Sequence, residues 1–292
     1  MENKIQSLLC QLGICDQQSI FPFYPRLRDR DDISVFKCKN SGVIFLSRQD
    51  HMDIAHYKEM EGFSYWGSEE RKRAAIVSLE DNQRRYAQFR DVIANKIWLD
   101  VGTGSGGILD LLSPVASETL AVEPQKAARQ SLIDSGYEVY PLINEVPRND
   151  IEIVTLFHVF EHFTHPLESL EALKKKMKEG AKIVIEVPHA NDFLIDFLDL
   201  EPFKAFTFWS EHLILHTRHS LGLFLQKAGF KDIIIKGFQR YPLANHLHWL
   251  SKGKPGGHIH WSQLRTMELE AAYSNMLLSL DKTDTLIAVA EI

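Results

Sequence analysis

Short apolar strands alternate with helical segments through the last two thirds of the chain, and this alternation constrains the fold more than any other feature. From Lys96 onward the apolar runs are rich in β-branched residues, as strands buried on both faces require. Neighbouring parallel strands need a crossover of about a dozen residues or more, which is usually a helix. The sequence therefore predicts an α/β fold with a mostly parallel sheet and helices on both faces.

The predicted sheet has seven strands with helices between them. The strands are expected at residues 97–101, 119–123, 138–140, 151–157, 182–187, 232–236 and 285–290. Helices are expected from about residue 107 and at residues 166–178, 220–228 and 267–280. Gly180 is interpreted as the residue that ends the helix before it, because glycine readily takes the left-handed conformation found there. Residues 237–283 then form an insertion before the last strand.

The first 95 residues differ in texture and are predicted as a separate lobe with a helical lid, followed by a sheet domain at residues 96–292. The stretch ISVFKCKNSGVIF indicates two strands around a turn at residues 40–42. Residues further along carry Tyr65 and Trp66, which we expect on a lid that excludes water from a cofactor. Ordinary packing between helices explains these two aromatic side chains equally well.

Composition bears on whether the protein binds nucleic acid, spans a membrane or is secreted. The net charge of −6 does not favour a nucleic-acid partner. No apolar run approaches the roughly 20 residues that span a bilayer, so no membrane span is expected. The cysteines, Cys10, Cys15 and Cys38, are too few and odd in number for a secreted disulfide framework. We expect a cytoplasmic protein, either monomer or homodimer.

A glycine-rich turn follows the first predicted strand in WLDVGTGSGG. Gly102 and Gly104 allow close backbone approach to a ligand, and the next helix offers free N–H groups. Glu123 ends the second strand, where a carboxylate can accept hydrogen bonds from two ribose hydroxyls. Together these features predict a cofactor that contains adenosine. They fit a nicotinamide cofactor as well as S-adenosylmethionine, because the glycine spacing also matches the dinucleotide fingerprint.

Several motifs in order resemble those of class I methyltransferases, especially the subgroup with quinone and sugar methyltransferases. These are LDVGTGSG, AVEP, VTLFHVFEHFTHPLESLEALKKKMKEGAKIVIEVPH and RHSLGLFLQKAGF. The resemblance implies a Rossmann-like fold, S-adenosylmethionine as cofactor, and a last strand that inserts antiparallel beside the fifth. It implies that Asp100 addresses the amino group of the cofactor. The expected cofactor-binding residues are Asp100, Gly102, Thr103, Gly104, Glu123, Pro124, His158 and Tyr65.

The pattern His158-Val-Phe-Glu161-His162 also matches the H-x-x-E-H of inverted zinc peptidases. That chemistry needs both histidines on one helix face, whereas His158 follows a strand directly and Pro166 opens the next helix. We therefore expect a loop beside the cofactor crevice, with His158 as a candidate base. His162 and Glu161 are expected in the same pocket, with packing as the alternative.

The segment FWSEHLILHT contains Glu211 and His212 between the fifth strand and a late helix. In sugar C-methyltransferases that resemble this chain, a Glu-His pair at this point serves acid/base chemistry. The resemblance therefore adds these two residues to His158 and His162 as catalytic candidates, with a structural histidine as the alternative. Histidine suits the role of base because its ordinary pKa lies near working pH.

No metal is predicted. The N-terminal region resembles a metal-binding lobe of some sugar C-methyltransferases, but serine stands at position 41, where that lobe has the second cysteine of a pair with Cys38. Four good ligands, which a structural zinc needs, are not evident.

The insertion is expected to help bind a small-molecule acceptor. It carries aromatic, amide and cationic side chains that suit a sugar or sugar phosphate. They are Arg240, Tyr241, Asn245, His246, His248 and Trp249. A surface insertion or a dimer contact is the alternative. The predicted function is methyl transfer to a nucleotide-linked or surface-glycan sugar. A quinone or phenolic O-methyltransferase, a nicotinamide-dependent oxidoreductase and a non-catalytic binding protein remain open.

Overall fold

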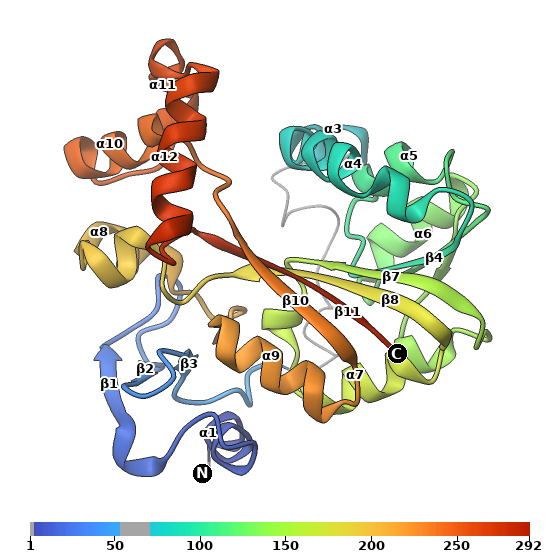
Figure 1. Ribbon diagram of the computed structural model, residues 1–292, viewed down its shortest axis with the longest axis horizontal. Coiled ribbons are helices and arrows are strands. Elements are labelled where there is room, and N and C mark those ends of the chain that lie inside the picture. The colour runs from blue at the N-terminus through green and yellow to red at the C-terminus, as the bar shows by residue number, and fades with distance from the viewer. Residues whose placement is uncertain (1–2, 53–70) are drawn as a thin grey trace.

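The computed structural model describes residues 3–52 and 71–292, and its centre is a seven-stranded sheet (Figure 1). The strand order is β10-β11-β8-β7-β4-β5-β6. The strands are β4 (Ile97–Val101), β5 (Glu118–Val122), β6 (Glu138–Tyr140), β7 (Ile151–Phe157), β8 (Met177–Pro188), β10 (Lys231–Phe238) and β11 (Thr285–Glu291). The predicted α/β fold is confirmed.

The sheet is parallel from β6 to β8, and β11 inserts antiparallel between β8 and β10. This is the arrangement that the resemblance implied for the last strand. Because β7 lies beside β4, the chain order reverses there, and the carboxyl ends of β4, β5 and β7 form one edge. Ligands of open α/β sheets bind at such a reversal.

One helix ends earlier than predicted. α7 covers Pro166–Lys174, and the chain passes almost directly into β8. Gly180 therefore does not cap a helix, and that interpretation was wrong. Its left-handed φ of +74° lies inside β8, beside a shift in the β7–β8 register between Ile151 and Ile153. A glycine of this conformation marks an irregular strand as readily as a helix end.

Helices cover both faces of the sheet. α4 (Leu79–Ile93), α5 (Gly107–Leu112) and α6 (Lys126–Asp134) share one apolar cluster with the sheet, centred on the buried indole of Trp98. α7 and α9 (Arg218–Lys227) belong to the larger cluster on the other face. The short α3 (Arg71–Val77) precedes α4. These layers bury the central strands, which are mostly apolar, as the sequence predicted.

A second, antiparallel sheet joins the N-terminal lobe to the rest of the chain. Its strands are β1 (Ile20–Tyr24), β2 (Val35–Cys38), β3 (Ile44–Leu46) and β9 (Ile214–Leu215), after the N-terminal helix α1 (Lys4–Gln11). The predicted pair of strands around residues 40–42 is confirmed. β9, however, comes from the segment after β8, and both sheets share one apolar core. The division at residue 95 stays a prediction.

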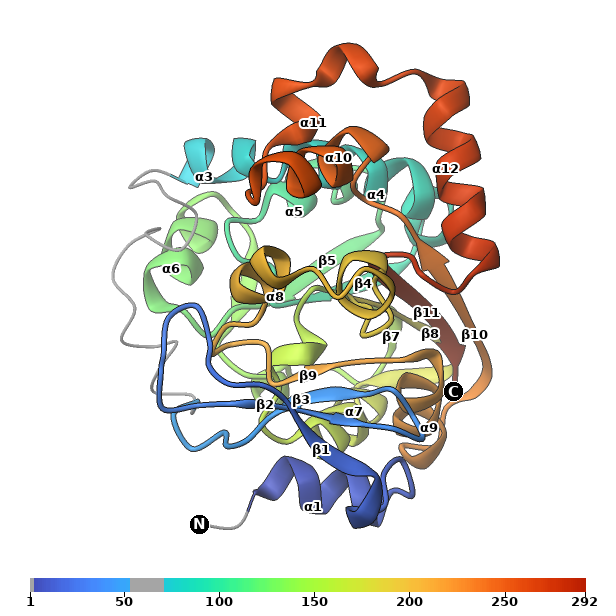
Figure 2. The same ribbon diagram turned by 90° about the vertical axis from the view of Figure 1, so that its left-hand side faces the viewer.

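The predicted insertion is helical and stands at the upper end of both views (Figures 1 and 2). It contains α10 (Leu243–Lys252), α11 (Gly257–His260), a 3₁₀ turn (Ser262–Leu264) and α12 (Met267–Ser279). α8 (Glu201–Thr207) lies below it, after a π-helical turn (Phe193–Phe197). Across residues 3–52 and 71–292, none of the helices has the length and apolar character needed to cross a membrane.

Candidate active site

A cavity of about 600 Å³ opens at the carboxyl ends of β4, β5 and β7. Nearly every residue that the sequence analysis assigned to the site lines it. These are Asp100, Gly102, Thr103, Gly104, Glu123, Pro124, His158, His162, Glu211 and His212. Tyr65 and Trp66 lie outside the described residues. One continuous cavity therefore brings together the predicted cofactor residues and all four catalytic candidates.

The glycine turn after β4 forms one wall of the cavity. Gly102 and Gly104 both have left-handed φ angles, of +71° and +59°. A Cβ at Gly102 would lie 2.4 Å from Cγ2 of Val159, so no larger residue fits without moving the loop after β7. The N–H of Gly102 donates to the carbonyl of Val122, at 2.8 Å. The turn is thus held against the tip of β5.

Glu123 lies at that tip, just after β5, and is only 5% exposed. Its Oε2 accepts the N–H of Gly104 at 2.7 Å, and its Oε1 accepts the N–H of Gln125 at 2.8 Å. Burial raises the pKa of this carboxyl to about 7, against the two backbone hydrogen bonds that favour its charged form. The carboxylate therefore links the glycine turn to β5 while lining the cavity.

Asp100 lies one strand away, inside β4, and is 2% exposed. Its Oδ1 accepts the hydroxyl of Thr155 at 2.5 Å, and that hydroxyl in turn accepts the indole N–H of Trp98 at 2.8 Å. Burial raises the pKa of Asp100 to about 6. Two carboxyl groups thus meet at the same end of the cavity, on neighbouring strands.

His158 follows β7 with a left-handed φ of +57°, on a loop as predicted. Its Nδ1 lies 3.3 Å from Oε1 of Glu161, and its Nε2 lies 3.2 Å from Oε1 of Glu186 and 3.0 Å from Nη1 of Arg240. Burial and Arg240 oppose protonation, but the two carboxylates outweigh them and raise the pKa of His158. Both ring nitrogens are therefore engaged by neighbouring side chains.

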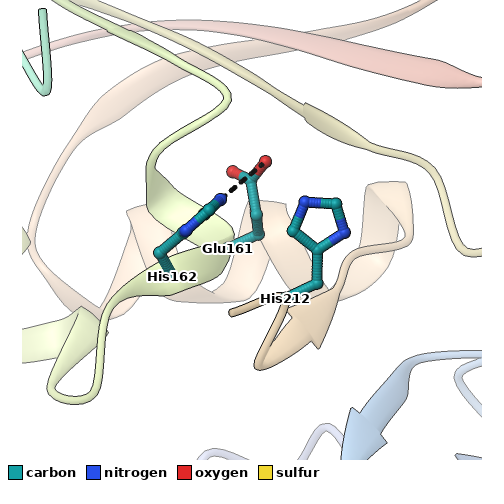
Figure 3. Close-up of side chains that lie close together, drawn as sticks. All are labelled: Glu161, His162 and His212. Carbon is teal, nitrogen blue, oxygen red and sulfur yellow. Dashed lines mark ion pairs between the residues drawn. The ribbon is translucent and has the colours of Figure 1, made fainter. Parts of the chain in front are cut away.

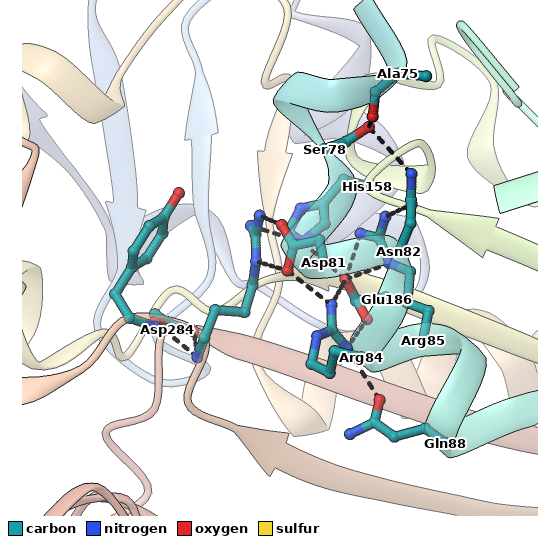
Figure 4. A network of polar contacts seen from close by, with 12 residues as sticks. Ala75, Ser78, Asp81, Asn82, Arg84, Arg85, Gln88, His158, Glu186 and Asp284 are labelled. Atoms are coloured by element: carbon teal, nitrogen blue, oxygen red, sulfur yellow. Dashed lines mark hydrogen bonds and ion pairs between the residues drawn. The ribbon is translucent and has the colours of Figure 1, made fainter. Parts of the chain in front are cut away.

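A buried charge network behind His158 was not foreseen (Figure 4). Glu186, fully buried in β8, accepts two bonds from Arg84, both at 2.8 Å, and two from Arg85, at 2.6 and 3.2 Å. Arg240 pairs with Asp81, so that α4 is tied to both the sheet and the insertion. The sequence does contain a feature that indicates such a network: a glutamate inside the apolar run KIVIEVP. A charged side chain on a buried strand requires partners of opposite charge.

A second group of titratable residues contains Glu161, His162 and His212 (Figure 3), and Nδ1 of His158 faces it through Glu161. Glu161 and His162 lie on the 3₁₀ turn η4 (Phe160–His162), and His212 precedes β9. Nε2 of His162 lies 3.7 Å from Oε1 of Glu161, and its Nδ1 lies 3.6 Å from Oε2 of Glu211. The rings of His162 and His212 meet edge to face, with their centroids 5.2 Å apart.

The electrostatics of this group keep two imidazoles neutral beside a charged carboxylate. Burial lowers the pKa of His162, although the carboxylates of Glu161 and Glu211 favour its charged form. Burial, followed by the neighbouring His162, places the pKa of His212 well below its ordinary value. Burial alone would raise the pKa of Glu161, but contacts with the histidines lower it to about 2.

The insertion does not present its polar side chains to the cavity, with the exception of Arg240. Asn245 accepts the backbone N–H groups of Gly256 and Gly257. Three further side chains that we expected to contact an acceptor are buried within the insertion or against α8: His246 beside Tyr273, His248 at the carbonyl of Lys254, and Trp249 against Phe203. That expectation was wrong for these four, because they pack within the insertion or against α8 instead of lining the cavity.

Comparison with known proteins agrees with this architecture. A family model described as a methyltransferase domain matches residues 71–234, more than half of the chain. Among solved structures, the chain is similar to a SAM-dependent methyltransferase from Archaeoglobus fulgidus, with 19% identity, a TM-score of 0.50 and coverage of 72% of this chain and 94% of that chain. A SAM-dependent methyltransferase from Thermotoga maritima has 13% identity and a TM-score of 0.50, covering 75% of this chain and 93% of that chain.

A search of curated proteins found no match. At these identities the solved structures support the fold, whereas the family model supports the family. The residues at the glycine turn and at the tip of β5 suit a ligand with adenosine. Buried carboxylates of Asp100, in β4, and Glu123, after β5, line the cavity there. The chain belongs to the methyltransferase family and is an enzyme whose cofactor is S-adenosylmethionine.

Proposed function

We propose that this methyltransferase acts on a small, sugar-like acceptor, nucleotide-linked or part of a surface glycan, that binds at the histidine end of the cavity. The observation that carries the proposal is the continuity of the cavity from Glu123 to His212. One end offers acids and glycines for the cofactor. The other offers imidazoles and a carboxylate for an acceptor.

At the cofactor end, Glu123 would hold the ribose hydroxyls and Asp100 the amino-acid amino group. Leu142 and Ile143, which also line the cavity, offer apolar contacts to a base. When bound, S-adenosylmethionine supplies a methyl group activated by a sulfonium. The protein then has to align the acceptor and remove its proton.

At the acceptor end, we assign the central role to His212. Its Nδ1 is buried and accepts no hydrogen bond from the described part of the chain, and its lowered pKa keeps the imidazole neutral. His158, by contrast, has both nitrogens occupied by Glu161, Glu186 and Arg240. We therefore propose that His158 positions the loop after β7, while the lone pair of His212 serves to activate the acceptor.

The polar character of this end favours a hydroxylated acceptor. Charged or titratable side chains from three elements surround it: His162 from η4, Glu211 and His212 from the segment before β9, and Arg240 from the insertion. Sugars bind through many hydrogen bonds, which such groups supply. Met52 and Phe163 also line the cavity, and they keep a phenolic or quinone acceptor as the second candidate.

The test is release of S-adenosylhomocysteine from the donor in the presence of two acceptor panels, sugar nucleotides and dihydroxylated aromatic compounds. We expect turnover with the first panel. Turnover with the aromatic panel alone would overturn the sugar assignment. His212→Ala should lower turnover about 100-fold or more, as loss of a general base does, without changing the affinity for S-adenosylhomocysteine measured by calorimetry. Equal turnover would remove His212 from the mechanism.

A further inference from the structure

Three potential metal ligands converge beside the proposed acceptor position. One ligand atom each from Glu161, His162 and His212 lies within 4.8 Å of the other two (Figure 3). Two imidazole nitrogens and a carboxylate oxygen form a donor set that divalent first-row transition metals favour. Ligands about 2.1 Å from such an ion lie roughly 3.0 to 4.2 Å apart. Small side-chain rotations would therefore bring all three into range.

The carboxylate of Glu161 lies in surroundings that favour a bound cation. Glu161 is fully buried, and neither of its oxygens accepts a hydrogen bond from the described residues. Imidazole nitrogens of His158 and His162 lie 3.3 and 3.7 Å from its Oε1. A buried carboxylate without hydrogen bonds is costly, and a bound cation would offset that cost.

The orientation of His162 provides an independent observation. Its Nδ1 faces Oε2 of Glu211 at 3.6 Å, while its Nε2 faces Glu161. Histidine ligands commonly direct their second nitrogen at a carboxylate, which fixes the tautomer so that the other nitrogen presents its lone pair to the metal. The backbone maintains this geometry, because the N–H of Leu213 donates to the carbonyl of Glu161 at 2.9 Å.

We propose that Glu161, His162 and His212 bind one divalent transition-metal cation, such as Zn²⁺, Co²⁺ or Mn²⁺, which coordinates a hydroxyl of the acceptor. This inference rests on the proposed function and changes one step of it: His212 activates the acceptor through the ion that it binds and does not itself accept the proton. Glu211 is a positioning residue that orients His162. The sequence alone does not predict the site, because His212 follows a different strand from the other two ligands.

The ion changes no oxidation state in this scheme. It lowers the pKa of the acceptor hydroxyl, as a Lewis acid does, so that the proton passes to solvent. The acceptor oxygen then forms a bond to the methyl carbon as the carbon–sulfur bond breaks, and the electron pair of that bond stays on sulfur. Atoms and charges balance without an additional reactant.

The direct test is metal binding without an acceptor. The full-length protein is dialysed against a chelator and then titrated with Co²⁺, followed by its visible absorption bands, and with Zn²⁺ by calorimetry. We expect one equivalent to bind. Glu161→Gln and His212→Ala should each weaken binding by about 100-fold or more, and Glu211→Gln by roughly ten- to a hundredfold, the usual effect of removing a residue that orients a ligand.

His219→Ala is the matched control, because His219 is an exposed histidine on α9, outside the cluster. It should bind Co²⁺ like the unchanged protein. The affinity for S-adenosylhomocysteine and the melting temperature of each variant show whether it still folds. Absence of a stoichiometric ion in the folded protein would overturn the metal site, as would equal Co²⁺ affinity in Glu161→Gln.

The outcomes separate this inference from the proposed function. Full turnover in the presence of chelator would refute the metal and leave the acceptor assignment intact. Stoichiometric Co²⁺ binding that depends on Glu161 supports the metal site, even if neither acceptor panel is methylated. In that case the acceptor assignment fails and the ion-binding cluster stands.

Discussion

Replacement of Glu123 by alanine tests the cofactor end of the cavity most directly. Each oxygen of this carboxylate accepts one backbone N–H, from Gly104 at 2.7 Å and from Gln125 at 2.8 Å. A carboxylate oxygen has two lone pairs, so each oxygen retains one acceptor position. The two free positions match the two neighbouring hydroxyls of a ribose. Glu123→Ala should therefore weaken the binding of S-adenosylhomocysteine.

The magnitude follows from the hydrogen bonds that are lost. A hydrogen bond to a charged group contributes about 1.5–3 kcal/mol. At about 1.4 kcal/mol for each factor of ten, loss of one such bond weakens binding by roughly ten- to a hundredfold. The substitution also leaves the N–H groups of Gly104 and Gln125 without this acceptor, which loosens the glycine turn. Because two such bonds can be lost, we expect affinity to fall by about a hundredfold or more.

Calorimetry with S-adenosylhomocysteine at pH 8 measures this effect, because Glu123 has a pKa of about 7 and is then mostly ionised. Glu118→Ala is the matched control, since Glu118 begins the same strand at its far, exposed end. Its affinity should equal that of the unchanged protein. If Glu123→Ala binds within a factor of two of the control while its melting temperature is unchanged, Glu123 does not hold the cofactor.

Two further predictions concern ionisation and the buried network. The affinity for S-adenosylhomocysteine should fall about tenfold between pH 8 and pH 6, since Glu123 is protonated below its raised pKa of about 7 and a neutral carboxyl loses its charge-assisted bonds. Asp100, with a pKa of about 6, should leave only a smaller fall in Glu123→Gln. A flat profile in the unchanged protein, or an equal fall in Glu123→Gln, contradicts this. Glu186→Ala should lower the free energy of unfolding by about 3–5 kcal/mol, because Arg84 and Arg85 lose their buried partner; a loss below about 1 kcal/mol in denaturant titration would show that the network does not stabilise the fold.

The cofactor end could be predicted from the sequence because its determinants are local. A strand, a glycine turn and a helix follow one another without a gap, and Gly102 takes the left-handed conformation that the pattern requires. The rule that parallel strands end at one edge then places Glu123 beside the turn. The predicted bounds of β5 differ from the observed ones by one residue at each end, so Glu123 still lies at the tip of the strand.

Long-range pairing explains what the sequence did not show. Arg84 and Glu186 are separated by 102 residues, and no local pattern specifies which arginine a buried glutamate will meet. The prediction that the insertion contacts an acceptor was wrong for a different reason. Residue type alone does not show whether His246 and Trp249 line an acceptor site or pack inside a small helical unit. Their burial, which only the structure shows, distinguishes the two roles.

The position of the histidine cluster depends on the N-terminal lobe, although that lobe contributes none of its three residues. β3 pairs with β9, and the N–H of Leu46 donates to the carbonyl of Leu213 at 3.1 Å. Leu213 in turn donates to the carbonyl of Glu161. A chain of backbone hydrogen bonds thus runs from the lobe through the segment of His212 to the turn with His162. The lobe therefore helps to position the proposed acceptor end, since its strand β3 pairs with the segment that carries His212, and that segment is bonded to the turn that carries His162.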